Sequence, residues 1–443
     1  MPELDVPYIA TSLPGPRAAR VLATERRWGS PSYSQGMPLV WDHAADCVIT
    51  DVDGNRFIDL TAGIVVANAG HSHPKVVRAI QEQSARLITC YDAVHEARAA
   101  LVETLVGLLP GPEWRVVLLT TGSEAIEAAI KVARLTTGRH EILSFQGSFH
   151  GRTYGALSAS GLRAPKRGFG PLLAGFVHAP YPYCYRCPLG QTPPHCALHG
   201  AAYLEDLLAT QSTGDVAAVL IEPYLGVGGC VFPPAGYLAA LREFCDRHDF
   251  LLILDEIQSA FGRTGTMFAF EQEGIVPDMI CVAKGMTSGV PTSALLARSR
   301  FLEAMPAGSI TSTNAGNPLS AAACLATIQV IEEEELCQRS RDMGQYFLGA
   351  LEEVQQRYGC VGEVRGRGLA IGVEIVRDRE SRSPDPTRAA EFVRRAFHRG
   401  VLLLPPVGLF GNVVRITPPL TISRPLVDRA VEVFRAVLEE LAG

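Results

Sequence analysis

Short segments rich in valine, isoleucine and leucine recur through the middle of the chain, separated by longer segments whose apolar residues follow a helical spacing. Several of the short segments are apolar on both faces, as strands are when helices cover both sides of a sheet. Strands joined through helices pair in parallel, so the pattern predicts an α/β fold built on a mainly parallel sheet. The strands are expected at 115–119, 141–145, 216–221, 250–254 and 279–282.

The pattern changes after about residue 320, where long amphipathic helices replace the alternation. Strands are expected within 364–376 and 413–420, and a last helix within about 425–441. A chain of 443 residues with 47% apolar composition can bury the cores of two or three domains. We therefore predict an N-terminal segment (1–60) that packs with the small domain, a large domain (61–320) and a smaller C-terminal α+β domain (321–443).

The overall composition narrows the classes of partner. A net charge of −6 and the lack of a dense Lys/Arg run argue against nucleic acid or an anionic membrane surface. The N-terminus has acidic residues and prolines where a secretion signal needs a basic start and an apolar core. No apolar run approaches the ~18 residues of a membrane span, and most of the 11 cysteines stand singly in apolar segments, as reduced thiols do. We expect a soluble, cytoplasmic protein that acts on small molecules.

The turn Thr-Thr-Gly-Ser at 120–123 joins a predicted strand to a predicted helix. Unpaired backbone N–H groups and the positive end of the helix dipole converge at such a turn, which makes it an anion site suited to a phosphate. Taken alone, the same residues are more often an ordinary helix N-cap.

Charged residues follow two predicted strands. Asp255 and Glu256 end one apolar strand, where a buried carboxylate needs a partner such as a pyridinium nitrogen. Lys284 ends the next strand among apolar neighbours, which lowers the pKa of its amine and favours the nucleophilic form. Taken alone, the two carboxylates could equally be exposed in a loop, and an exposed loop lysine is the commoner case for Lys284. The signal becomes strong only when these residues are combined with the phosphate turn.

Six motifs occur in a fixed order: TGSEAIEAAIKVAR, SFHGRT, IEP, DEIQSAFGRTG, AKG and TNAGNP. In this order and at these spacings the chain resembles the class III aminotransferases, the ornithine and 4-aminobutyrate group, from about residue 51 to 423. The resemblance implies a type I fold of enzymes that depend on pyridoxal 5'-phosphate (PLP), with a mainly parallel seven-stranded sheet, flanking helices and a smaller α+β domain. It also implies PLP as cofactor and a homodimer with shared active sites.

The resemblance assigns the central roles in the cofactor site. It makes Lys284 the catalytic residue that carries PLP as a Schiff base, and it places Asp255 at the pyridine nitrogen. Gly122 and Ser123 would bind the phosphate.

Four further positions complete the implied cofactor site. Phe149 would stack on the ring, because an aromatic face matches a planar heterocycle. Gln258 would approach the phenolic oxygen, and Glu222 would form hydrogen bonds near Asp255. Thr313 would reach the phosphate of the neighbouring subunit.

Two arginines bear on the substrate. By the resemblance, Arg152 matches the position that binds a distal carboxylate, and Arg415 matches the one that receives the α-carboxylate. Many members carry an acid where this chain has Val227, and in several of them that acid pairs with the α-carboxylate arginine. We therefore expect Arg415 to stay available and the enzyme to prefer substrates with an α-carboxylate.

The expected reaction moves an amino group between an amino acid, or a related amine, and a 2-oxo acid. The alternative is an amino-acid racemase or epimerase on the same scaffold, because RGRGLAIGVEIV and GNVVRITPPLTIS resemble such enzymes as closely. A decarboxylating relative and a catalytically inert binding protein of the same fold are weaker alternatives.

The chain contains a cysteine-rich insertion, YPYCYRCPLGQTPPHCALH. Cys184, Cys187, Cys196 and His199 have residue types that bind zinc, but a structural loop of unpaired thiols near the site entrance is the favoured interpretation. We predict no metal site.

Overall fold

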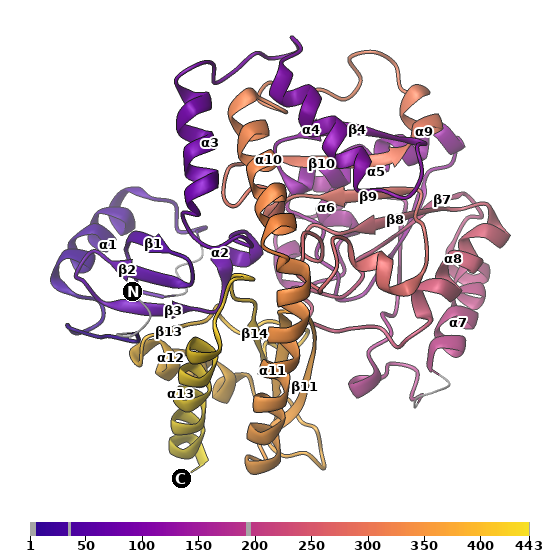
Figure 1. Cartoon of the computed structure of the whole chain (residues 1–443). Helices are drawn as coiled ribbons and strands as arrows, with labels where there is room; N and C mark the ends of the chain where they lie inside the picture. The colour runs from indigo at the N-terminus through magenta and orange to yellow at the C-terminus, as the bar shows by residue number, and fades with distance from the viewer. Residues whose placement is uncertain (1–5, 34–36, 192–195, 443) are drawn as a thin grey trace.

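The computed structural model describes residues 6–33, 37–191 and 196–442, and the middle of the chain forms one seven-stranded sheet (Figure 1). Every strand runs parallel to the others except β10, which is antiparallel to both of its neighbours. The spatial order is β4 (Trp114–Leu119), β10 (Ser293–Arg298), β9 (Met279–Val282), β8 (Leu251–Asp255), β7 (Val216–Ile221), β5 (Glu141–Phe145) and β6 (Phe176–Ala179).

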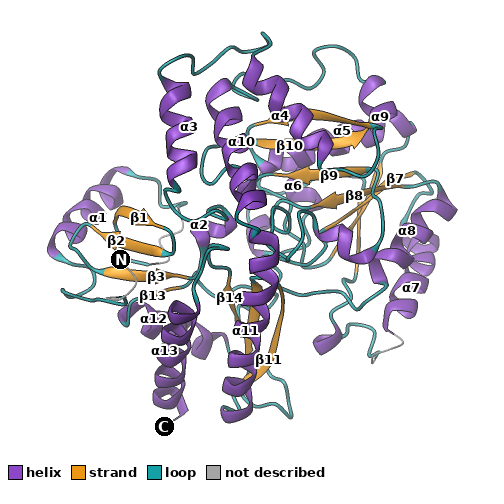
Figure 2. Ribbon diagram, in the orientation of Figure 1, coloured by secondary structure: helices purple, strands orange, loops and turns teal. Residues whose placement is uncertain are grey.

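Helices cover both faces of this sheet (Figure 2). Successive residues of β8 show why its sequence is apolar throughout: Leu252 and Leu254 pack in one core, and Ile253 packs in another. The helices of this part are α4 (Glu96–Gly107), α5 (Gly122–Thr137), α6 (Tyr154–Ala159), α7 (Cys196–Gln211), α8 (Tyr237–His248) and α9 (Ser299–Glu303). The predicted strands at 115–119, 141–145, 216–221, 250–254 and 279–282 all lie in this sheet.

The C-terminal part is a smaller α+β unit, as predicted. Its three-stranded antiparallel sheet has the order β11 (Val361–Arg367), β12 (Ala370–Ile375) and β14 (Val413–Ile416). Its helices are α10 (Pro318–Glu333), α11 (Leu336–Arg357), α12 (Pro386–His398) and α13 (Arg424–Ala442). Together with the seven-stranded sheet and its helices, this unit confirms the predicted fold class.

The N-terminal strands pair with a strand from the far end of the chain. Val401 of β13 (Val401–Leu402) lies beside Ile58, in parallel register. The resulting four-stranded sheet has the order β1 (Trp41–Ala45), β2 (Val48–Asp51), β3 (Arg56–Asp59) and β13. The helices of this region are α1 (Pro16–Trp28), α2 (Ala62–Val65) and α3 (Pro74–Ser84). The domain boundaries themselves stay a prediction.

The parallel strands bring distant residues to one edge of the large sheet. Asp255 is the last residue of β8, Glu222 follows β7 directly, and Lys284 lies two residues beyond β9. Ligands of open α/β sheets bind at this carboxyl edge. Among the described helices, none is long and apolar enough to cross a membrane.

Candidate active site

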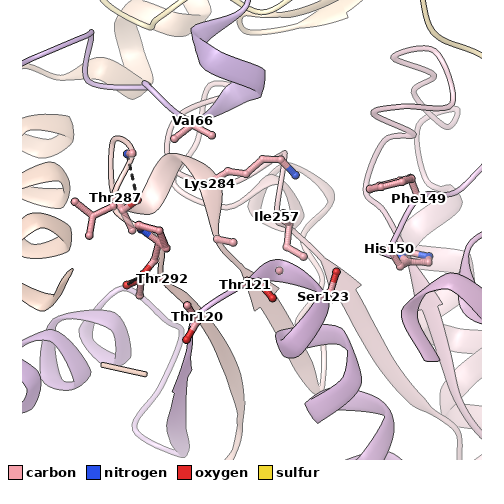
Figure 3. Close-up of a pocket in the computed structure, with 16 residues that line it drawn as sticks. Val66, Thr120, Thr121, Ser123, Phe149, His150, Ile257, Lys284, Thr287 and Thr292 are labelled. Atoms are coloured by element: carbon pink, nitrogen blue, oxygen red, sulfur yellow. Dashed lines mark hydrogen bonds between the residues drawn. The ribbon is translucent and has the colours of Figure 1, made fainter. Parts of the chain in front are cut away.

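A cleft of about 300 Å³ opens at the carboxyl edge of the sheet. Figure 3 shows Lys284 reaching across it, with the N-terminus of α5 below and Val66 above. Ile257 lies on its floor, and Phe149 and His150 form its far side. The cleft therefore combines one amine, one aromatic ring and one helix N-terminus.

Lys284 is held in an unusual environment. Its backbone has a φ of 41°, a left-handed conformation that costs energy for a residue with a side chain and that clusters at active sites. Burial lowers the pKa of its amine to about 8, although the nearby Asp255 carboxylate acts in the opposite direction. A substantial fraction of the amine is therefore neutral near neutral pH, as a nucleophile requires.

The carboxylate of Asp255 has a partner that the sequence analysis missed. His150 Nδ1 lies 2.7 Å from Asp255 Oδ2, and both side chains are buried. The backbone N–H of Ile257 donates to Asp255 Oδ1 at 3.1 Å. These bonds fix the direction of the carboxylate at the carboxyl end of β8. A signal for His150 was present in SFHGRT, because a strand-end carboxylate requires a buried donor.

The N-terminus of α5 fits a phosphate. Thr121 and Glu124 form a reciprocal capping box, which satisfies the N–H groups of both residues. Within the described chain, the N–H groups of Gly122 and Ser123 have no partner, so they can donate to an anion. Gly122 cannot be replaced freely, since a Cβ there would lie 2.9 Å from Ile257 Cδ1.

Glu222 positions one wall of the cleft. Its carboxylate accepts hydrogen bonds from the backbone N–H of Phe149 at 2.7 Å and of Gly226 at 2.9 Å. Burial, with a contribution from the nearby Asp255 carboxylate, raises the pKa of Glu222 to about 7. Glu222 therefore fixes the backbone that carries the Phe149 ring.

Arg415 is a buried cation without a matching anion. It lies on β14 with 4% of its surface exposed, and its Nη1 donates to Gln258 Oε1 at 3.3 Å. Its Nε atom is buried with no hydrogen-bond partner. No carboxylate of the described residues pairs with it, and Val227 supplies none. A carboxylate ligand would satisfy both the charge and the unused donor.

Two predicted site residues, Arg152 and Thr313, are exposed and do not line the cleft. Arg152 is exposed, with its guanidinium 5.8 Å from the centre of the Phe149 ring. Thr313 is exposed as well, and its neighbour Ser312 donates to Glu124 Oε1 at 3.1 Å. The loop of Thr313 therefore starts beside the phosphate end of α5 and faces outward.

The cysteine-rich insertion is described in part. Cys184 and Cys187 both have intermediate exposure, and Cys187 is a free thiol. The side chains of Cys196 and His199 lie outside the described residues, so the zinc alternative is untested.

The cleft as a whole fits pyridoxal phosphate, with N–H donors for the phosphate, a buried carboxylate for the ring nitrogen and an amine for the aldehyde. The family model described as "Aminotransferase class-III" matches residues 30–438. The chain belongs to the class III aminotransferases. It is a PLP-dependent enzyme that moves an amino group between an amino compound and a 2-oxo acid.

Relatives of this class III aminotransferase are named for different activities. Alanine/serine racemase of Pyrococcus horikoshii is 37% identical and covers 99% of this chain and 94% of its own. 4-Aminobutyrate aminotransferase of Mycobacterium leprae is also 37% identical and covers 97% of each chain. The solved PLP-bound amine transaminase of an uncultivated Pseudomonas species superposes with a TM-score of 0.88 at 33% identity, over 94% of this chain and 98% of its own.

Proposed function

We propose that this class III aminotransferase uses amino donors that carry an α-carboxylate, and that Arg415 receives that group. The observation that supports the proposal is the buried, unpaired guanidinium of Arg415 beside Gln258. A buried guanidinium costs free energy unless an anion pairs with it, and a bidentate carboxylate is its best partner. The site therefore selects a substrate that brings the missing charge.

Each residue of the site has a chemical task in this proposal. Bound pyridoxal phosphate supplies an electron sink for the pair that remains when the substrate loses its Cα proton. Lys284, whose pKa burial lowers to about 8, accepts that proton and returns it. Asp255, held by His150, keeps a negative charge at the ring-nitrogen end of the cleft. Gly122 and Ser123 bind the phosphate through their free N–H groups.

Racemisation is the second candidate, because a relative covering 99% of this chain bears a racemase name. A racemase that uses two bases needs a second acid/base group across from Lys284. Among the described residues that line the cleft, the other titratable side chain is His150, and Asp255 already engages it. This arrangement favours aminotransfer.

We also propose a homodimer in which Thr313 reaches the phosphate of the neighbouring subunit. Exposed apolar side chains between α3 and α4 support it, since patches of this kind mark interfaces. They are Leu87 (42% exposed), Ile88 (54%), Tyr91 (54%) and Val94 (84%). Sedimentation of the holoenzyme measures the assembly state, and a monomer that retains full activity would contradict the proposal.

A cytoplasmic location is proposed as well. Nine cysteines whose side chains the structure describes, including the buried Cys47, Cys245 and Cys281, are free thiols, as expected in a reducing compartment. Localisation of a tagged full-length protein in its own cell tests this expectation.

The test of function is a half-reaction without any oxo acid. The absorbance of the bound cofactor is followed while L- and D-amino acids are added, and each amino acid is paired with the amine that lacks its carboxylate. Aminotransfer predicts a change to the amino form of the cofactor with an amino acid. Arg415→Met should raise the amino-acid concentration needed for half-saturation by about 30-fold or more. It should leave the half-saturation concentrations of the matched amines unchanged. Decay of optical rotation with an unchanged cofactor spectrum would replace aminotransfer by racemisation.

A further inference from the structure

The segment 180–191 includes the CxxC insertion, and the proposed chemistry gives it no task. Two of its side chains leave the segment and reach Glu374 on β12 of the small domain. The Tyr183 hydroxyl donates to the Glu374 carboxylate, and Arg186 Nε donates to Glu374 Oε1 at 2.5 Å. Tyr183 is 6% exposed, and the Glu374 side chain is fully buried. The insertion is thus anchored to the sheet that carries Arg415.

The register of that sheet places Glu374 between two arginines. Gly372 on β12 lies opposite Arg365 on β11 and opposite Arg415 on β14. Glu374 is two residues from Gly372, so its side chain points to the same face. It is therefore the diagonal neighbour of both arginines, at a separation that long side chains span.

Of these two arginines, Arg365 forms the ion pair with the carboxylate of Glu374. Arg365 Nη1 donates to Glu374 Oε2 at 2.8 Å, whereas the Arg415 guanidinium turns to Gln258. Burial alone would raise the pKa of Glu374, but Arg365 and the hydrogen bonds from Tyr183 and Arg186 hold it below its ordinary value. Glu374 is therefore an anion at neutral pH.

The charges on the Arg365 side of this face are balanced without Arg415. Glu363 and Glu374 supply two negative charges, and Arg365 and Arg186 supply two positive ones. Arg365 also donates to the carbonyl of Gly229 at 2.6 Å, which closes the Gly229 segment over the sheet. Without Arg186 the cluster would carry one net negative charge. Arg415 lies on the same face and has no ion-pair partner among the described residues.

We propose that Tyr183 and Arg186 are positioning residues that hold Glu374 on the Arg365 side and so keep the charge of Arg415 free for the α-carboxylate of the substrate. The 180–191 segment then contributes to substrate specificity, and this role does not depend on its cysteines. This inference rests on the proposed use of Arg415 and extends it to residues that do not touch the substrate.

The test compares Arg186→Met with Arg382→Met in the holoenzyme. Arg382 Nη1 donates to the carbonyl of Tyr185 at 3.0 Å, so it contacts the same segment without any hydrogen bond to Glu374. One readout is the dissociation constant of propionate, an unreactive carboxylate, measured from the absorbance of the bound cofactor. The second is the half-reaction with L-alanine and with ethylamine, and with L-leucine and isoamylamine, where each amine lacks only the carboxylate.

Arg186→Met should raise the propionate dissociation constant and the half-saturation for both amino acids by roughly 10- to 100-fold. The rate constants of the two amines should change by less than about 3-fold, and Arg382→Met should leave all values unchanged. Adding Glu374→Gln to Arg186→Met should restore carboxylate binding, because a neutral amide cannot neutralise Arg415. A purely structural role of Arg186 would not give this rescue.

Equal losses for amino acids and amines, or no rescue by Glu374→Gln in a folded protein with normal cofactor content, would overturn the inference. If Arg186→Met does not fold, Tyr183→Phe carries the same test, since it removes one hydrogen bond and keeps the packing of the ring. A wild-type enzyme that reacts with no donor would refute the proposed function, whereas the propionate titration would still decide the inference.

Discussion

The pKa of Lys284 can be tested directly in the apoenzyme. Burial lowers it from 10.5 to about 8. This difference of about 2.5 pH units raises the neutral fraction of the amine at pH 7 roughly 300-fold. The rate constant for covalent attachment of pyridoxal phosphate should therefore rise about tenfold per pH unit up to a midpoint near 8 and then level off. A solvent-exposed lysine would show no such plateau before about pH 10.

Stopped-flow absorbance across this pH range measures the rate constant. Division by the value for free N-acetyl-lysine cancels the titration of the cofactor itself, so this ratio should be constant below about pH 8 and fall about tenfold per pH unit above it. Lys284→Ala supplies the blank. Because the unfolded lysine keeps its higher pKa, the unfolded apoenzyme binds more protons between the two pKa values, and the free energy of unfolding rises with pH through that window. A rate constant that still climbs tenfold per unit beyond about pH 9 would refute the buried-amine argument.

Three further variants test the site and its support. Asp255→Asn should keep the fold and lower the transamination rate by on the order of 10²- to 10³-fold, because it removes a fixed charge; activity within tenfold of wild type would count against that role. Arg263 is fully buried, and its Nη2 donates to Asn68 Oδ1 at 2.7 Å. Arg263→Met should lower the free energy of unfolding by about 3 kcal/mol, because it leaves buried acceptors without their hydrogen-bond donor. An unchanged calorimetric midpoint would contradict this expectation. Gly122→Ala should weaken PLP binding about tenfold by pressing on Ile257, and Ile257→Val, which removes the clashing methyl group, should recover it; equilibrium dialysis measures both.

The sequence predicted the fold class and the strand ends because these depend on local pattern. Asp255 and Lys284 could be placed together, since parallel strands bring their carboxyl ends to one edge. The parts that escaped prediction depend on contacts between distant segments. The pairing of His150 with Asp255 spans 105 residues, and the hydrogen bond from Tyr183 to Glu374 spans 191. Neither has a local spacing rule, so only the folded chain shows them.

The parallel pairing of Ile58 with Val401 has a consequence for synthesis of the chain. All seven strands of the large sheet lie between Trp114 and Arg298, so that sheet can form while the C-terminal part is still being translated. The N-terminal sheet cannot, because its fourth strand is made almost last. Its apolar residues therefore emerge from the ribosome first and wait longest for their partner, which makes this region the one that most needs chaperone protection during translation.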